Sequence, residues 1–123
     1  GGCVMHAMKC SDEGFSGFGE AYFSTVQSGS VKAWKRHKDM TLNIVVPVGS
    51  IRFVIYNEQQ FKEVIISRKN YIRLTVPPML WFGFQAVGDE TAILMNVASI
   101  EHDPDEVERK DIESFDFDWS IKR

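Results

Sequence analysis

Short runs of apolar and β-branched residues alternate with turn residues along most of the chain. These runs occupy residues 19–27, 31–37, 41–48, 51–57, 61–67, 71–76, 80–86 and 92–99. Val, Ile, Phe and Tyr dominate them, and the breaks carry Gly, Ser, Asn and Pro, which is typical of β-strands joined by tight turns. About eight strands at a spacing near ten residues predict a closed or sandwiched all-β domain.

The break at Gly49-Ser50 separates two strongly apolar runs. A two-residue loop with Gly in the first position is typical of a type II′ turn, in which Gly supplies a positive φ. We therefore expect the strands over 41–48 and 51–57 to pair as a β-hairpin.

The pattern changes after residue 100. Asp103 is followed by Pro104 and then by Glu106, a combination typical of a capped helix start, and it predicts a short helix over about 104–111. The aromatic residues beyond that helix alternate with acids. They are Phe115, Phe117 and Trp119. Such alternation is typical of a final strand or an extended arm that packs its rings on another surface, such as that of a partner subunit.

The composition is that of one globular domain. A chain of 123 residues leaves little room for a second domain, and 44% apolar residues suffice for a core. The formal net charge of −3 argues against bulk nucleic-acid binding. Because 9 of the 17 acidic residues lie within 101–123, we interpret that tail as a solvated surface segment.

The cysteines and the N-terminus indicate where the protein works. Cys3 and Cys10 are the only cysteines and do not make a disulfide framework, so we expect a reduced, cytoplasmic protein. No apolar run approaches the roughly 18 residues of a membrane span, and no signal peptide is recognisable, so we expect no membrane partner. We interpret the opening Gly1-Gly2 as the remnant of an expression tag.

The densest cationic cluster reads Lys-Ala-Trp-Lys-Arg-His-Lys and begins at Lys32. In a strand, Lys35 and His37 would share one face, while Lys32, Trp34 and Arg36 would share the other. If the first face lines a barrel, the cluster predicts an anion or diphosphate site beside a titratable His. The alternative is a solvated edge strand whose cations prevent pairing with other chains.

The histidines argue against a metal site. His6, His37 and His102 are the only ones, and a β-barrel metal centre needs two or three that converge at short spacing with a carboxylate. Lys35 occupies the slot next to His37, and a protonated Lys repels a cation and offers no lone pair. We expect no metal and no other cofactor.

A second cluster, Val-Pro-Pro-Met-Leu-Trp-Phe-Gly-Phe, ends at Phe84. Trp81 and Gly83 would share one face, and Phe82 and Phe84 the opposite one. A large aromatic beside a Gly can form a floor for a closely approaching ligand, whereas the alternative is ordinary core packing.

Four segments, residues 18–24, 31–38, 76–84 and 102–107, resemble in order and spacing the short members of the dTDP-4-dehydrorhamnose 3,5-epimerase-like (RmlC-like) cupin family. The similarity runs over about 15–119. It implies a double-stranded β-helix, or jelly-roll barrel, that is usually dimeric, binds a sugar nucleotide in the barrel mouth and needs no metal.

This resemblance also divides the chain and supplies site residues. It implies an N-terminal arm over 1–14, a cupin barrel over 15–100, and a short helix with an acidic aromatic tail over 101–123. The family abstracts a proton next to a C4 ketone and returns it from the opposite face. Its catalytic His falls on Lys35 and its catalytic Tyr on Met95.

Other family positions carry over unevenly. A His of the third segment falls on Phe82 and a Gly there on Met79, whereas the phosphate-binding cation falls on Lys32 and keeps its charge. Because Met and Phe cannot exchange a proton, His37 and Lys35 become the candidate catalytic residues. The candidate substrate-binding residues are Lys32, Arg36, Arg73, Trp81 and Asn96.

These considerations leave three functions open. The first is an epimerase acting on a nucleotide-linked 4-keto-6-deoxy hexose. The second is a binding protein for a nucleotide-diphosphate sugar that has lost turnover, and the third is a 3,4-ketoisomerase. In each case we expect a homodimer that binds no nucleic acid.

Overall fold

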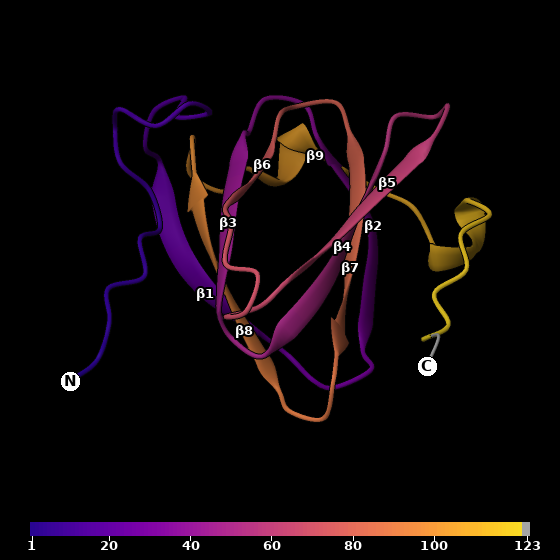
Figure 1. Ribbon diagram of the computed structural model, residues 1–123. Coiled ribbons are helices and arrows are strands. Elements are labelled where there is room, and N and C mark those ends of the chain that lie inside the picture. Colours follow the sequence, from indigo (N-terminus) through magenta and orange to yellow (C-terminus); the bar gives the residue numbers. More distant parts are fainter. Residues whose placement is uncertain (122–123) are drawn as a thin grey trace.

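The computed structural model describes residues 1–121 and is almost entirely β-structure (Figure 1). The first eight strands are β1 (Glu20–Val26), β2 (Val31–His37), β3 (Leu42–Val48), β4 (Ser50–Tyr56), β5 (Phe61–Ile66), β6 (Leu74–Val76), β7 (Trp81–Val87) and β8 (Ala92–Ala98). All eight lie within one or two residues of a predicted run, except that β6 begins later. The predicted all-β fold is confirmed.

The strands form two antiparallel sheets that face each other as a jelly-roll barrel (Figure 1). The four-stranded sheet has the order β1-β8-β3-β6, and the five-stranded sheet has the order β5-β4-β7-β2-β9. Strands that are neighbours in a sheet are mostly distant in sequence, as in β1 with β8 and β2 with β7. This arrangement matches the double-stranded β-helix that the resemblance implied.

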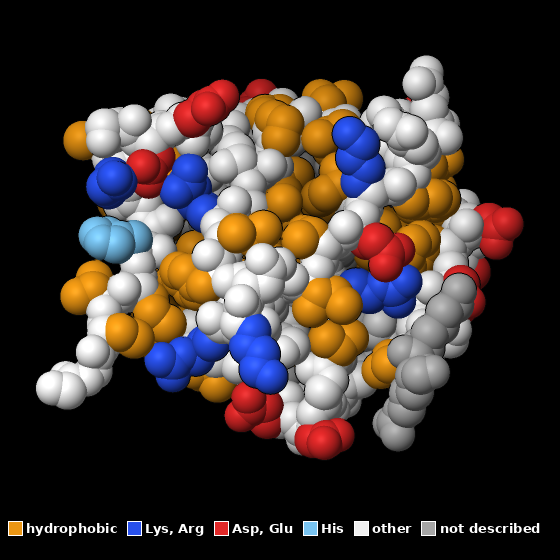
Figure 2. All heavy atoms as spheres, in the orientation of Figure 1, with side chains coloured by type: hydrophobic (Ala, Val, Ile, Leu, Met, Phe, Trp, Pro, Cys, Tyr) orange, Lys and Arg blue, Asp and Glu red, His pale blue; other side chains and the backbone are white. Residues whose placement is uncertain are grey.

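The core lies between the two sheets because alternate residues of each strand point inward. Leu42, Ile44 and Val46 of β3 face Phe53 of β4 and Phe82 of β7 in one buried cluster. In the orientation of Figure 1, Figure 2 shows hydrophobic side chains between the sheets with charged ones scattered around them. Burying each large apolar side chain stabilises the fold by about 1.5–3 kcal/mol.

The predicted hairpin at Gly49-Ser50 is wrong. Gly49 has the expected positive φ of 78°, but β3 and β4 belong to different sheets, so the turn carries the chain across the barrel corner. A Cβ added at Gly49 would lie 2.8 Å from the Cα of Ala92. Gly is therefore needed both for its conformation and for the close approach of β8.

The helix expected over 104–111 is also wrong. Only Pro104–Glu106 (η1) forms a 3-10 turn, started by the Asp103 side chain, which accepts a hydrogen bond from the N–H of Asp105. The chain is extended again at Val107 and forms β9 (Val107–Arg109), which pairs with β2. Sheet pairing with a distant strand thus overrides the local helix signal. In the described part of the chain, no helix is long and apolar enough to cross a membrane.

The aromatic tail packs on the outer face of the five-stranded sheet, so the surface that it covers belongs to its own chain. A second 3-10 turn, η2 (Ile112–Ser114), leads into it. We call the rings gathered there the outer aromatic cluster; they come from Trp34, Tyr56, Phe61, Trp81, Phe115, Phe117 and Trp119. Trp34 is 2% exposed, with the Phe115 ring centroid 5.4 Å away and the Trp119 centroid 5.3 Å away. The cluster is a second, smaller core that fixes the C-terminal segment.

Candidate functional site

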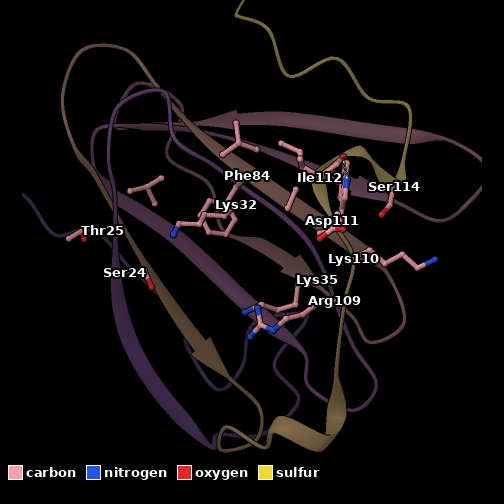
Figure 3. A pocket seen from close by; sticks show the side chains of 14 residues that line it. Ser24, Thr25, Lys32, Lys35, Phe84, Arg109, Lys110, Asp111, Ile112 and Ser114 are labelled. Carbon is pink, nitrogen blue, oxygen red and sulfur yellow. Dashed lines mark hydrogen bonds between the residues drawn. The ribbon is translucent and has the colours of Figure 1, made fainter.

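A cavity of about 1010 Å³ opens where the edge of β1 faces β2 and β9. Its inner wall carries Ser24, Lys32, Lys35, Phe84 and Arg109 (Figure 3). Ligand pockets in proteins typically enclose roughly 300–1,000 Å³, so the volume suits a ligand as large as a nucleotide-linked sugar. The cavity is lined by aliphatic, aromatic and cationic side chains together.

A β-bulge in β2 decides which cations face this cavity. The register against β7 shifts between Lys32 and Lys35, so that Lys32 lies opposite Phe84 and Lys35 opposite Phe82. Directly opposed residues share a sheet face, and both Phe rings pack into the inner core. The expectation that Lys32 faces away from Lys35 is therefore wrong, because simple alternation does not continue through a bulge.

Lys35 lines the cavity and lies directly opposite Arg109 in the β2–β9 ladder. Burial lowers the pKa of the Lys35 ammonium, and the positive charge of Arg109 lowers that pKa further, while the Glu106 carboxylate acts in the opposite direction. The Lys35 amine thus loses its proton more readily than an exposed lysine.

His37 projects from the same strand two residues beyond Lys35 and is 6% exposed. Its Nδ1 is hydrogen-bonded to Oε1 of Glu106, and its ring stacks on Phe82 with centroids 6.3 Å apart. Burial lowers the pKa of the imidazole, and Glu106 opposes this without cancelling it. A neutral imidazole at neutral pH can accept a proton, and the carboxylate holds its ring in one orientation.

Glu106 is a residue that the sequence analysis did not place in the site. Burial by itself raises the pKa of its carboxyl, but hydrogen bonds from His37 and from two backbone N–H groups lower it below the ordinary value. Those N–H groups belong to Asp39 and Met40, at 3.1 and 3.2 Å from Oε2. The carboxylate therefore ties the β2–β3 turn to η1 as well as orienting His37.

Two candidate binding residues lie outside the cavity. Arg36 projects to the outer face, where its guanidinium lies 4.6 Å from the Trp81 ring centroid and pairs with Glu108. Trp81 is 2% exposed within the outer aromatic cluster, and its Nε1 donates to Glu58 at 3.2 Å. The structure does not bring either residue together with Lys32 and Lys35.

Arg73 and Asn96 also have partners of their own. Arg73 binds Asp12 of the N-terminal arm at 2.9 Å and is thereby tied to the far edge of the four-stranded sheet. Asn96, 1% exposed, donates to the Tyr22 hydroxyl at 3.1 Å. Neither lines the cavity, so their proposed roles in substrate binding stay predictions.

Within residues 1–121, no group of three or more His, Cys, Asp or Glu side chains is arranged to hold a metal ion. The expectation of chemistry without a metal therefore stays a prediction. What the arrangement offers is a hydrogen-bond donor and cation, Lys35, at the wall of a large cavity. A proton acceptor, His37, lies two residues further along β2, buried behind that wall and not among the residues that line it.

Comparison with known proteins finds relatives that are named as sugar isomerases and epimerases. The family described as FdtA, WxcM-like, C-terminal, matches residues 20–117. The curated protein "Probable low-salt glycan biosynthesis epimerase Agl13" of Haloferax volcanii is 31% identical over 97 residues, which cover 70% of this chain and 62% of that protein. The chain thus spans less than two thirds of the length of this relative.

Two solved structures have the same architecture. A dTDP sugar isomerase from Desulfovibrio desulfuricans G20 is 40% identical, with a TM-score of 0.91 over 97% of this chain and 82% of its own. QdtA, a sugar 3,4-ketoisomerase from Thermoanaerobacterium thermosaccharolyticum in complex with TDP, is 17% identical, with a TM-score of 0.68 over 76% of this chain and 67% of its own. The second likeness shows the fold alone. The family match, the curated relative and the Desulfovibrio structure together confirm the predicted resemblance to cupin sugar-nucleotide isomerases and epimerases.

Proposed function

Because the chain belongs to the FdtA family of WxcM-like C-terminal domains, we propose that it acts on a nucleotide-diphosphate-linked 4-keto-6-deoxy hexose and moves a proton next to the C4 ketone. The observation that carries this proposal is the pairing of a buried His37–Glu106 dyad with Lys35 at the wall of a cavity large enough for such a substrate. The relatives and neighbours named for sugar isomerisation or epimerisation support it.

The chemistry requires a base, a stabiliser for the enolate and a proton donor. His37 takes the proton from the carbon next to the C4 carbonyl, and Glu106 stabilises the imidazolium that forms. The Lys35 ammonium donates to the C4 oxygen, on which the negative charge develops. Lys35 is also the second candidate base, because burial and Arg109 lower its pKa. Return of the proton to the same carbon from the other face gives the epimer.

A 3,4-ketoisomerase is the second candidate. Lys35 and His37 both project from β2, so both would approach the sugar from one side. Inversion at a carbon needs a proton from the opposite side, whereas movement of the carbonyl from C4 to C3 only requires that the proton taken from C3 be replaced by one at C4. Because Lys35 and His37 lie on one strand, their arrangement supports the 3,4-ketoisomerase as a second candidate function.

Solvent deuterium exchange tests the proposal directly. Incubation with dTDP-4-keto-6-deoxyglucose in D2O, followed by NMR, reports proton abstraction even when net conversion is slow. Deuterium retained at C3 or C5 identifies an epimerase, and deuterium at C4 with a C3 ketone identifies a ketoisomerase. If the protein binds the nucleotide sugar without any exchange, a non-catalytic binding protein replaces the enzyme.

The base is tested by His37→Gln. The exchange rate should fall about 10²–10⁴-fold, since this is the usual contribution of a positioned general base. His102→Gln, at an exposed histidine, is the matched control and should leave the rate unchanged. An unchanged rate in His37→Gln would remove His37 as the base and leave Lys35.

The expected cytoplasmic homodimer belongs to the same proposal. Light scattering coupled to size-exclusion chromatography measures the number of subunits, and a monomeric mass would overturn the dimer without touching the chemistry.

A further inference from the structure

The two faces of the short β2–β9 ladder carry opposite kinds of charge pair. On the outer face, Arg36 lies directly opposite Glu108, and the two form an ion pair. On the inner face, the next position of the same ladder sets Lys35 directly opposite Arg109. Directly opposed like charges in an antiparallel pair destabilise it, whereas opposite charges stabilise it. The fold therefore contains an unfavourable pair at the wall of its cavity.

No described acid neutralises that pair. Among residues 1–121, neither Lys35 nor Arg109 forms an ion pair, and Lys32, which the bulge turns to the same wall, forms none either. The Glu106 carboxylate interacts electrostatically with Lys35, but its oxygens already accept hydrogen bonds from two backbone N–H groups and are hydrogen-bonded to His37. Asp111 also lines the cavity, but it forms no ion pair with any of these three cations.

We propose that Arg109, delivered by β9, forms with Lys32 a subsite for the diphosphate of the ligand, and that Lys35 on the same wall stays available to the sugar. This inference rests on the proposed function for the identity of the ligand and adds a residue that neither the sequence pattern nor the carried-over family positions indicated. Figure 3 shows the ends of Lys35 and Arg109 side by side in the cavity, with Lys32 on the same wall. A guanidinium and an ammonium group on one wall suit the several oxygens of a diphosphate.

The neighbouring residue supplies a matched control. Lys110 also lines the cavity, but its ammonium lies 5.5 Å from the Trp81 ring centroid and 5.6 Å from that of Phe115. It therefore lies over the outer aromatic cluster, and it points away from Arg109 in Figure 3. Lys110→Gln and Arg109→Gln each remove one positive charge from adjacent positions. Only the second removes it from the proposed subsite.

The experiment is calorimetric titration of the full chain with TDP, inorganic pyrophosphate and thymidine. Arg109→Gln should weaken the binding of TDP and of pyrophosphate by roughly 10-fold or more, as expected for the loss of a charge-assisted hydrogen bond. Its affinity for thymidine should not change, Lys110→Gln should bind all three as the parent does, and Arg109→Lys should recover most of the loss. Arg109→Gln should also unfold at the same or a higher temperature, because it relieves the repulsion with Lys35.

Other results overturn the subsite. TDP binding that is unchanged in Arg109→Gln, equal losses in Arg109→Gln and Lys110→Gln, or a parent protein that binds neither phosphate compound would each exclude it. Deuterium exchange with an unchanged KM in Arg109→Gln would remove the subsite and leave the proposed enzyme in place. Arg109-dependent TDP binding without exchange in the parent would remove the enzyme and leave the subsite.

Discussion

The outer and inner faces of the five-stranded sheet treat charge in opposite ways. On the outer face, Arg36 pairs with Glu108 and stacks on Trp81, while Arg52 pairs with Glu63 and lies 4.9 Å from the Phe117 ring centroid. On the inner face, no described acid pairs with the cations that line the cavity. The two arginines of the outer face thus have their partners within one chain, whereas the inner face has the charge pattern of a site that a ligand completes.

This difference separates residues of similar chemistry by their role. Arg36 and Arg109 are both arginines of one two-stranded ladder, but the first holds β9 and the aromatic tail on the sheet and the second faces the cavity. A cation whose charge is already satisfied stabilises the fold, and one that is held opposite a like charge costs stability and is free to bind an anion. Three kinds of experiment test this difference between the two faces: an aromatic truncation, a change of pH and a reversal of each charge pair.

The largest effect is expected from Trp34→Ala, which removes the centre of the outer aromatic cluster. Trp34 is buried against Phe61, Phe115 and Trp119, and its Nε1 donates to the carbonyl of Ile112 at 3.1 Å. The free energy of unfolding in urea should fall by about 3–5 kcal/mol, as for other buried aromatic truncations. Affinity for TDP should fall as well, because the tail no longer holds β9 and Arg109 in place.

Phe23→Ala is the control for that substitution. Phe23 is 67% exposed on β1, so its loss should change the unfolding free energy by no more than about 0.5 kcal/mol. If both variants lost the same stability, the outer aromatic cluster would not be a second core.

A smaller effect is expected from pH, and it should come from the inner face. The pKa of His37 is lowered from 6.5 chiefly by burial. Below pH 6.5 the imidazole is therefore protonated in the unfolded chain while it is still neutral in the folded chain. The stability linked to this group is present above pH 6.5 and is lost as pH falls towards the folded-state pKa. Urea unfolding at pH 7.5 and 5.5 should show this loss.

His37→Gln should make that stability difference smaller, whereas Arg36→Gln should leave it unchanged, because the Arg36 side chain lies on the opposite face of the sheet from His37. An equally steep pH dependence in His37→Gln would contradict the assignment of the loss to the inner face.

The smallest effect on stability is expected from reversing the two charge pairs. Arg109→Glu makes the inner pair complementary to Lys35 and should raise the unfolding free energy by roughly 0.2–1 kcal/mol, while abolishing TDP binding. Glu108→Arg makes the outer pair repulsive and should lower stability by a similar or larger amount, because Arg36 is partly buried. A destabilised Arg109→Glu that still binds TDP would reverse the assignment of the two faces.

Local pattern was sufficient for the strands and for several faces. Trp81 and Gly83 do share the outer face, where the Trp119 ring approaches Gly83, and Phe82 and Phe84 share the inner one. These predictions succeed because side-chain direction alternates along any regular strand, whatever the strand pairs with. The candidate cations Lys32, Lys35 and Arg36 could also be found from the sequence, because they lie together in one short segment.

Long-range pairing decided the features that the pattern missed. The bulge that turns Lys32 inward exists only where β2 meets β7, and β9 forms only because the segment after Glu106 finds β2. The local signal there favoured a helix, and Arg109 would have been one solvated helical residue among several. Glu106 belongs to the site because its carboxylate finds His37, a residue distant in sequence.

The sequence by itself thus determined an all-β barrel, the residues of its eight main strands and a cationic segment beside a histidine. Only the tertiary structure decided that Lys32, Lys35 and Arg109 share one wall while Arg36 and Trp81 do not. The reason is that hydrophobic alternation is a property of each strand alone, whereas the meeting of charges across a ladder depends on the register between strands far apart in the chain.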